Sequence, residues 1–177
     1  TPANDAAEVS KVLKNSYGFT VETIYDGNRK SILDGIHKYI KKLKKNDSFL
    51  LYYAGHGEID RDTNTGYWQP VDADIETQTE WIDVESVSRA LKRFTAKNIL
   101  VVADSCFSGV IFRGLEAVKE TAKNNGTMGN QGYYATIQNA YDIQSRMAFT
   151  SGGVEPVVDA INKFENHSMF ARAFLDV

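Results

Sequence analysis

One thiol and one imidazole occupy matching positions in this sequence of 177 residues. Cys106 is the only cysteine, and it follows an apolar run at residues 98–103 with Asp104 and Ser105 between. His56 stands between two glycines, directly after a second apolar run at residues 49–54. A thiolate attacks a carbonyl carbon readily, and a nearby imidazole can protonate the leaving amine. These residue types indicate nucleophilic catalysis by Cys106 with the help of His56.

The elements that carry the two residues are predicted to bring them together. Continuous apolar runs such as 49–54 and 98–103 are typical of parallel strands that are buried on both faces. A helix capped by Asp83 is predicted between them, because apolar residues recur there at helical spacing. A strand–helix–strand unit makes its strands parallel, so their carboxyl ends meet at one edge of the sheet, where ligands bind. His56 and Cys106 are therefore expected to lie side by side.

Each residue also has a structural interpretation. A lone cysteine is more often a small buried hydrophobe than a nucleophile, and a lone histidine usually makes a structural contact. The occurrence of both at the ends of paired strands favours the functional interpretation, with the amides of Gly57 and Cys106 as candidate oxyanion donors. Ser105 and Ser108 are the alternative nucleophiles, in a different kind of hydrolase. A zinc site is disfavoured by the ligand spacing, and His37 and His167 are predicted to be structural.

The remaining pattern predicts a largely α/β chain. A first helix is expected from a cap at Asn4 or Asp5 to Gly18, followed by a short strand at 19–24. The clearest helix has Ile32, Ile36, Ile40 and Leu43 on one face and closes on a solvated run of lysines. Further predictions are a polar loop at 58–66, an extended piece at 67–72, a strand at 147–150 and a last helix at 168–177.

Composition describes an ordinary globular chain, predicted to be one domain over residues 1–177. Hydrophobic residues make up 42% and charged residues 24%, and the net charge is -3. This balance gives no reason to expect nucleic acid or a membrane as partner, and no apolar run approaches the roughly 20 residues that span a bilayer. A cytoplasmic location is the expectation. Because the sequence opens on Thr1-Pro2 and stops inside a helical pattern, we also expect trimmed ends.

Two blocks carry a resemblance to a known family. Residues 52–57 and 104–109 resemble the catalytic histidine and cysteine blocks of caspase-like cysteine peptidases (clan CD, family C14), most nearly the bacterial orthocaspases and the metacaspases. Their separation of about 50 residues fits caspase-type spacing. Segments 66–72, 145–152 and 167–170 also resemble parts of such proteins. The resemblance implies a caspase-like sandwich, with a mainly parallel central sheet flanked by helices, and a Cys106–His56 dyad.

The resemblance also bears on specificity. Asp104 lies two residues before the nucleophile, and a carboxylate there would attract a cationic P1 side chain and repel an aspartate. Metacaspase-like enzymes use acids in the S1 pocket in this way, and Asp5 resembles the second of these acids, although it could equally be a helix cap. The prediction is a cysteine endopeptidase that cuts protein or peptide substrates after Arg or Lys. The alternative is a catalytically silent caspase-like module with a binding or regulatory role.

Family members are often self-cleaved between two portions of the domain. Here the portions would be residues 1–112 and 133–177, joined by a linker at 113–132, and the candidate cleavage sites are Arg113, Lys119 and Lys123. Two departures stand out. Phe107 replaces the histidine of many metacaspases, which favours the bacterial relatives. The first central strand of the family should precede Asp5 and is missing, so additional residues are expected in the complete protein.

No cofactor is required by the sequence, although calcium is an open question, since some metacaspases need it. Four carboxylates offer the hard oxygen ligands that calcium prefers, namely Asp60, Asp62, Asp72 and Asp74. Their spacing is not that of an EF-hand loop, and a polar loop near the active site is the preferred interpretation.

Overall fold

The main sheet is parallel and three-stranded, with the order β1–β5–β6. A computed structural model describes residues 2–106, 144–152 and 167–176. The strands are β1 (Ser48–Ala54), β5 (Asn98–Asp104) and β6 (Ser145–Thr150). Both predicted apolar runs are therefore strands, and the parallel arrangement is confirmed. The register runs from Ser48 opposite Asn98 to Ala54 opposite Asp104, so β1 and β5 end level with each other.

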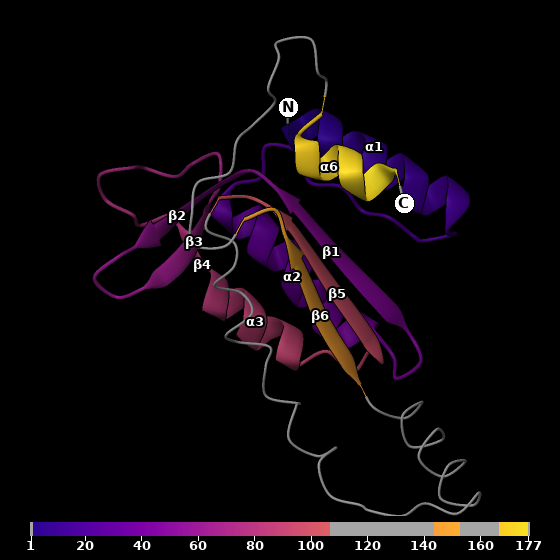
Figure 1. The fold of residues 1–177 in the computed structure, drawn as a ribbon. Helices are drawn as coiled ribbons and strands as arrows, with labels where there is room; N and C mark the ends of the chain where they lie inside the picture. Colours follow the sequence, from indigo (N-terminus) through magenta and orange to yellow (C-terminus); the bar gives the residue numbers. More distant parts are fainter. Residues whose placement is uncertain (1, 107–143, 153–166, 177) are drawn as a thin grey trace, which may run out of the picture.

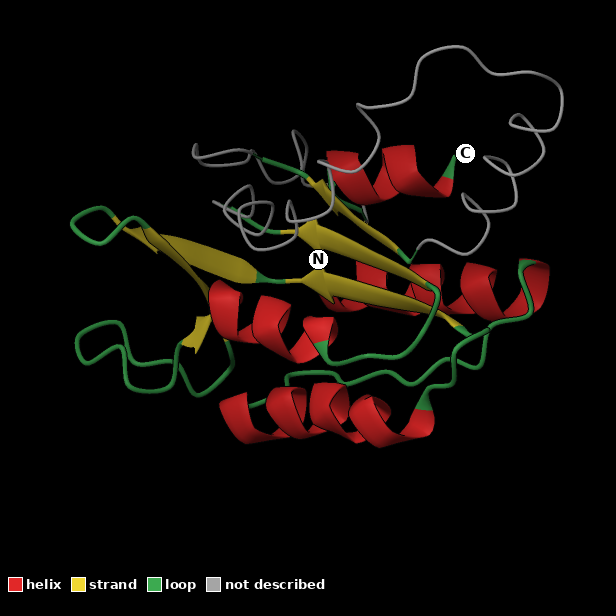
Figure 2. Ribbon diagram, turned by 90° about the horizontal axis from the view of Figure 1, so that it is seen from below, coloured by secondary structure: helices red, strands yellow, loops and turns green. Residues whose placement is uncertain are grey.

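Helices flank this sheet on both sides, which confirms the predicted α/β fold (Figures 1 and 2). They are α1 (Pro2–Ser16), α2 (Arg29–Lys42), α3 (Val84–Lys92) and α6 (Met169–Leu175). Figure 2 shows α2 and α3 together on one side of the sheet and α6, next to the C label, on the other. Helix α1 lies beside α6 and against β1. The core between α2, α3 and the sheet includes Ile36, Val87, Leu91, Phe94, Ile99 and Val101.

The starts of three helices follow from capping side chains. Asn28 accepts a hydrogen bond from the Ser31 amide at the start of α2, and Asp83 accepts one from Glu85 at the start of α3, both at 2.8 Å. Ser168 caps α6 in the same way. Helix α1 instead begins at Pro2, which suits a first helical turn because proline has no N–H to leave unpaired. The predicted cap at Asn4 or Asp5 is therefore wrong, since both residues lie inside the helix.

A second, antiparallel sheet replaces the loop predicted at 58–66. It consists of β2 (His56–Asp60), β3 (Thr65–Gln69) and the short β4 (Ile82–Asp83), and it projects away from the main sheet (Figure 1). Asp60 Oδ1 accepts hydrogen bonds from the amides of Asp62 and Thr63, which closes the turn between β2 and β3. The polar residues that suggested a loop therefore form a hairpin turn and the strands beside it.

One edge of β1 pairs with no other strand among the described residues. The strand predicted at 19–24 is wrong, because this segment pairs with no strand among the described residues. A cavity of about 1260 Å³ lies between this segment, α1 and β1. Residues 49–54 are accordingly half-buried, rather than buried on both faces as predicted. The expectation of a further central strand stays a prediction.

Strand β6 is held to the rest of the sheet by main chain and by one arginine. Six residues of β6 pair with β5, from Ser145 opposite Asn98 to Thr150 opposite Ala103. The Arg146 guanidinium donates hydrogen bonds to the carbonyl oxygens of Phe94 at 3.1 Å and of Ala96 at 3.2 Å. Burial lowers the pKa of Arg146 from its usual range, but the group remains a cation at neutral pH.

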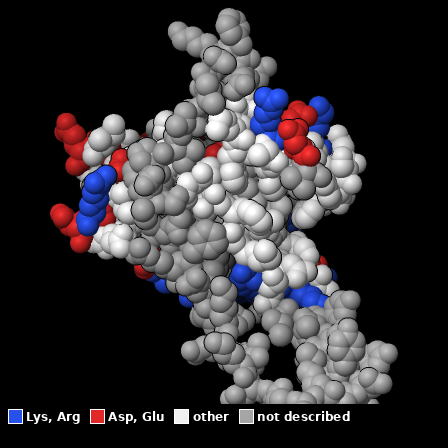
Figure 3. All heavy atoms as spheres, in the orientation of Figure 1, with Lys and Arg blue, Asp and Glu red and all other residues white. Residues whose placement is uncertain are grey.

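Several predictions fall on residues that the structure does not describe. Phe107, Ser108 and the linker at 113–132 with Arg113, Lys119 and Lys123 lie outside the described residues, so the division of the domain stays a prediction. Within the ranges described, no helix combines the length and apolar character needed to cross a membrane. On the face drawn in Figure 3, acidic and basic side chains are interspersed near α1 and near the β2–β3 turn.

Candidate active site

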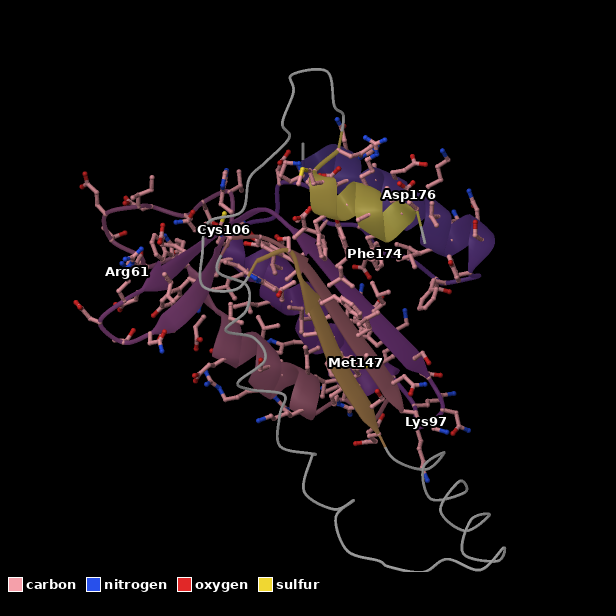
Figure 4. All side chains as sticks on the ribbon, in the orientation of Figure 1. Arg61, Lys97, Cys106, Met147, Phe174 and Asp176 are labelled. Atoms are coloured by element: carbon pink, nitrogen blue, oxygen red, sulfur yellow. The ribbon has the colours of Figure 1, made fainter. Side chains whose placement is uncertain are left out.

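The level ends of β1 and β5 place the histidine and cysteine turns next to each other. Ala54 is paired with Asp104, and the next residue, Gly55, donates its amide to the Asp104 carbonyl at 3.2 Å. His56 and Cys106 each follow two residues after this last pair. Figure 4 shows Cys106 at the edge of the main sheet where the second sheet departs. The predicted meeting of the two turns is therefore present in the fold.

Gly57 makes the closest approach between the turns. A Cβ atom at this position would fall well inside contact distance of the Cys106 carbonyl oxygen and the Ser105 hydroxyl, and 3.3 Å from the Tyr67 carbonyl. Two of these three neighbours are backbone atoms, which cannot swing aside as a flexible side chain can. Glycine is therefore required here, and it lets the residue after His56 pack directly against the peptide of Cys106.

A hydrogen bond from β1 holds the main chain of His56, while its side chain is exposed to solvent. The residue is exposed, and Cys106 is half-buried. The Tyr53 hydroxyl donates a hydrogen bond to the His56 carbonyl at 2.9 Å. The Tyr53 ring stacks on Trp68 with ring centroids 4.0 Å apart, and burial raises the pKa of its phenol. This stack ties β1 to the strand that pairs with Gly57, so the turn has support on two sides.

Ser105 has a structural role in this arrangement. It is 4% exposed, its amide donates to Ser151 Oγ at 3.0 Å, and Ser151 Oγ donates back to its carbonyl at 3.3 Å. Its own hydroxyl donates to the Cys106 carbonyl at 3.3 Å. A hydroxyl so buried and engaged is poorly placed to attack a substrate. Ser108, the other alternative nucleophile, lies outside the described residues.

The two predicted S1 acids converge on one dipeptide at the start of α6. Asp5 is 1% exposed; its Oδ1 lies 2.7 Å from His167 Nδ1, and its Oδ2 accepts the Ser168 amide at 3.4 Å. The Ser168 hydroxyl donates to Asp104 Oδ2. Asp5 and Asp104 are thus neighbours, although one lies on α1 and the other ends β5. The interpretation of Asp5 as a helix cap is wrong, because Asp5 lies inside α1. Its carboxylate lies beside that of Asp104 instead.

Tyr52 lies next to the same acids. Burial, and then the charges of Asp104 and Asp5, raise the pKa of its phenol above the ordinary value. Its hydroxyl oxygen is buried and has no hydrogen-bond partner among the described residues. Its ring stacks on Phe174 of α6 at a centroid distance of 6.1 Å. The acid side of the site therefore contains one phenol and two carboxylates against α6.

Comparison with known proteins agrees with this geometry. A sequence profile of the caspase domain of the C14 peptidases matches residues 1–177. The chain belongs to the caspase domain family. It is 29% identical over 125 residues to Metacaspase-1 from two strains of Saccharomyces cerevisiae, YJM789 and ATCC 204508 / S288c, which covers 61% of this chain. The match spans only 29% of the length of those relatives.

A solved structure supports the fold. The crystal structure of protein GSU0716 from Geobacter sulfurreducens superposes with a TM-score of 0.55 at 21% identity. The superposition covers 85% of this chain and 63% of that one. At this identity the likeness concerns the fold of the caspase domain alone.

The predicted calcium ligands do not gather in this caspase domain. Among the described residues, no group of three or more His, Cys, Asp or Glu side chains could hold a metal ion. Asp60 and Asp74 each accept two main-chain amides in their own turns, and Asp72 accepts the Arg29 amide. These three carboxylates serve as main-chain hydrogen-bond acceptors.

Two residues of the site were not found by sequence reasoning. His167 was predicted to be structural, and the structure places it against Asp5, while Ser168 joins Asp5 to Asp104. The local signals were a serine just ahead of the last helical pattern, which predicts a cap, and the resemblance of residues 167–170 to a segment of the family, and neither indicates a contact with an acid. His167 is 162 positions from Asp5 in the sequence, and Ser168 is 64 positions from Asp104.

Proposed function

We propose that the protein is a cysteine endopeptidase that cleaves peptide bonds after Arg or Lys. The observation that carries this proposal is the packing of Gly57 on the peptide of Cys106, which sets the His56 and Cys106 turns against each other at the sheet edge. Membership of the caspase domain family supports the cysteine peptidase class. The acids beside the turns support the basic P1 preference.

In this mechanism the Cys106 thiolate attacks the scissile carbonyl carbon and forms a tetrahedral oxyanion. The main-chain N–H groups of Gly57 and Cys106 are the candidate donors to that oxyanion. His56 protonates the departing amine, the C–N bond breaks, and an acyl-enzyme remains on Cys106. Water, activated by His56, then attacks the thioester, so the acid is released and the thiol is restored.

The acids supply the selectivity in this proposal. A guanidinium or ammonium entering beside Asp104 would gain a charge-assisted hydrogen bond there and the electrostatic attraction of the buried Asp5. A P1 aspartate would meet two carboxylates and be repelled. Tyr52, whose phenol has a raised pKa next to both acids, stays neutral and adds no third negative charge.

The test compares fluorogenic peptides that differ only at P1, with Arg, Lys or Asp. Wild type is expected to cleave the Arg and Lys peptides and leave the Asp peptide, whereas Cys106→Ala cleaves none. His56→Ala should lose about 10²- to 10⁴-fold in rate, the usual contribution of a general acid–base group. Running each assay with calcium and with a chelator settles metal dependence. A well-folded wild type that cleaves no peptide would favour the silent binding or regulatory module.

Self-processing is a separate part of the proposal. The candidate bonds follow Arg113, Lys119 and Lys123, which are basic like the proposed P1 residues. Incubated wild type should yield two fragments whose new termini identify the bond, and Cys106→Ala should stay intact. Fragmentation of Cys106→Ala at the wild-type rate would assign the cut to an outside protease.

A further inference from the structure

His167 and Ser168 make three separate contacts with the two acids. His167 Nδ1 meets one oxygen of Asp5, and the Ser168 amide reaches the other. The Ser168 hydroxyl donates to Asp104. Ser168 therefore contacts both carboxylates at once, one through its main chain and one through its side chain, so their separation is set by the size of a single residue.

The dipeptide is itself held in place by α6. Ser168 Oγ accepts the Ala171 amide at 2.9 Å, which fixes the hydroxyl at the start of the helix, and Ser168 is only 6% exposed. Farther along α6, Phe174 stacks on Tyr52 of β1. Figure 1 shows α6 lying alongside α1, the helix that carries Asp5. Helix α1, strand β5 and the dipeptide ahead of α6 thus meet at the acids, and Ser168 is the residue that contacts both.

We propose that His167 and Ser168 are positioning residues of the S1 pocket, which hold Asp5 and Asp104 in the geometry that receives a cationic P1 side chain. This inference rests on the proposed P1 preference and adds to it the residues that make the preference possible. Neither residue takes part in bond breaking.

The physical reason is preorganisation. Two neighbouring carboxylates repel each other and would turn apart if nothing held them. Hydrogen bonds to both oxygens of Asp5 and to one of Asp104 fix their directions before a substrate arrives. A guanidinium then meets Asp104 already oriented, with the charge of the buried Asp5 fixed beside it, and less binding free energy is lost in ordering the two acids.

Two matched pairs of variants separate positioning from simple folding. Ser168→Gly removes the hydroxyl but suits a helix cap nearly as well as serine, and Ser168→Thr restores the hydroxyl. His167→Leu removes the contact with Asp5, whereas His167→Asn keeps a donor close to the position of Nδ1. Circular dichroism and thermal unfolding show whether each variant is folded.

The decisive measurement is binding to these variants in a Cys106→Ala background, which needs no turnover. Two fluorescent peptides carry P1 arginine or P1 citrulline, its uncharged isostere, and the ratio of their affinities reports the charge recognition of S1. Ser168→Gly and His167→Leu should each lower this ratio about fivefold to tenfold, as expected for one lost charge-assisted hydrogen bond. Ser168→Thr and His167→Asn should keep most of it. With Cys106 present, the Gly and Leu variants should raise KM for the Arg peptide and leave kcat nearly unchanged.

Each outcome supports or overturns the positioning role of His167 and Ser168. An undiminished ratio in folded Ser168→Gly and His167→Leu overturns the positioning role while leaving the proposed function intact. An equal fall of the ratio in Ser168→Thr and Ser168→Gly also overturns it, as does an equal fall in His167→Asn and His167→Leu. Either result would reflect packing alone. A wild-type ratio of one overturns the basic P1 preference and this inference with it. A ratio above one without any cleavage by wild type overturns the proposed catalysis and leaves the inference standing. If Ser168→Gly does not fold, the pair at the more exposed His167 decides alone.

Discussion

The two halves of the site are built by different means. The dyad side, with His56 and Cys106, is built from main-chain contacts. Strands β1 and β5 are paired in register, and the Gly55 amide donates to the Asp104 carbonyl. Gly57 packs on the Cys106 peptide. On the acid side, side chains from α1 and β5 meet a dipeptide ahead of α6. The dyad side therefore depends on backbone register, and the acid side on the docking of a helix.

This difference predicts different sensitivities to mutation. A register fixed by seven strand pairs tolerates side-chain changes, except where two backbones touch. A cluster of side-chain contacts responds to the loss of any one polar group, because each carboxylate depends on its own donors. Catalytic rate should therefore respond to changes at the turns, and P1 selectivity to changes at the acids.

Gly57→Ala should give the largest effect on the dyad side. The new methyl group must displace the Cys106 peptide, and a misplacement near 1 Å costs about a hundredfold in rate. The measurement is kcat/KM with the Arg peptide, together with the rate at which iodoacetamide alkylates Cys106.

Gly35→Ala is the matched control for this variant. Its Cβ would meet only Ile24 Cδ1, the flexible end of a side chain, at 2.7 Å. Its turnover should stay near that of wild type. If Gly57→Ala were as active as Gly35→Ala, backbone contact could not be what positions the dyad.

Asp104→Asn tests the acid side and should have the next largest effect. The amide keeps the shape but loses the charge, so kcat/KM for the Arg peptide should fall about tenfold or more through KM, as for a lost charge-assisted bond. Alkylation of Cys106 by neutral iodoacetamide should change little. A variant that alkylates slowly yet keeps its KM would instead assign Asp104 to the dyad side.

The smallest effects come from two neighbouring tyrosines of β1. Tyr53→Phe removes the bond to the His56 carbonyl and should lower kcat about twofold to tenfold, the range of one hydrogen bond. Tyr52→Phe removes a buried hydroxyl that has no partner among the described residues. It should leave kcat unchanged and stabilise the fold by about 1 kcal/mol, measured by urea unfolding. Equal losses of kcat in Tyr53→Phe and Tyr52→Phe would show that the two faces of β1 do not differ in their effect on catalysis.

The meeting of the His56 and Cys106 turns was predictable because its signals are local. His56 and Cys106 each follow a continuous apolar run, and parallel pairing then brings the run ends together whatever lies between. The hairpin of β2 and β3 escaped prediction because polar turn residues at 60–64 dominate the window, and Gly57 interrupts β2. The strand expected at 19–24 failed because alternation alone does not supply a partner to pair with.

The acid side was only half predictable. A carboxylate near the cysteine could be inferred at Asp104, since both belong to one short segment. Asp5 resembles a helix cap in sequence, and its burial depends on a helix more than 160 positions away. His167 and Ser168 carry no local sign of what they touch. Contacts made by single side chains across such distances leave no periodic pattern in a sequence.

The attachment of β6 has a consequence for the integrity of the molecule. Six strand pairs, the Arg146 fork on the carbonyls of Phe94 and Ala96, and the exchange of hydrogen bonds between Ser151 and Ser105 are all non-covalent. None of them requires an unbroken chain through residues 107–143. A cut there would leave a two-chain particle that migrates as one species in native conditions and separates only when denatured.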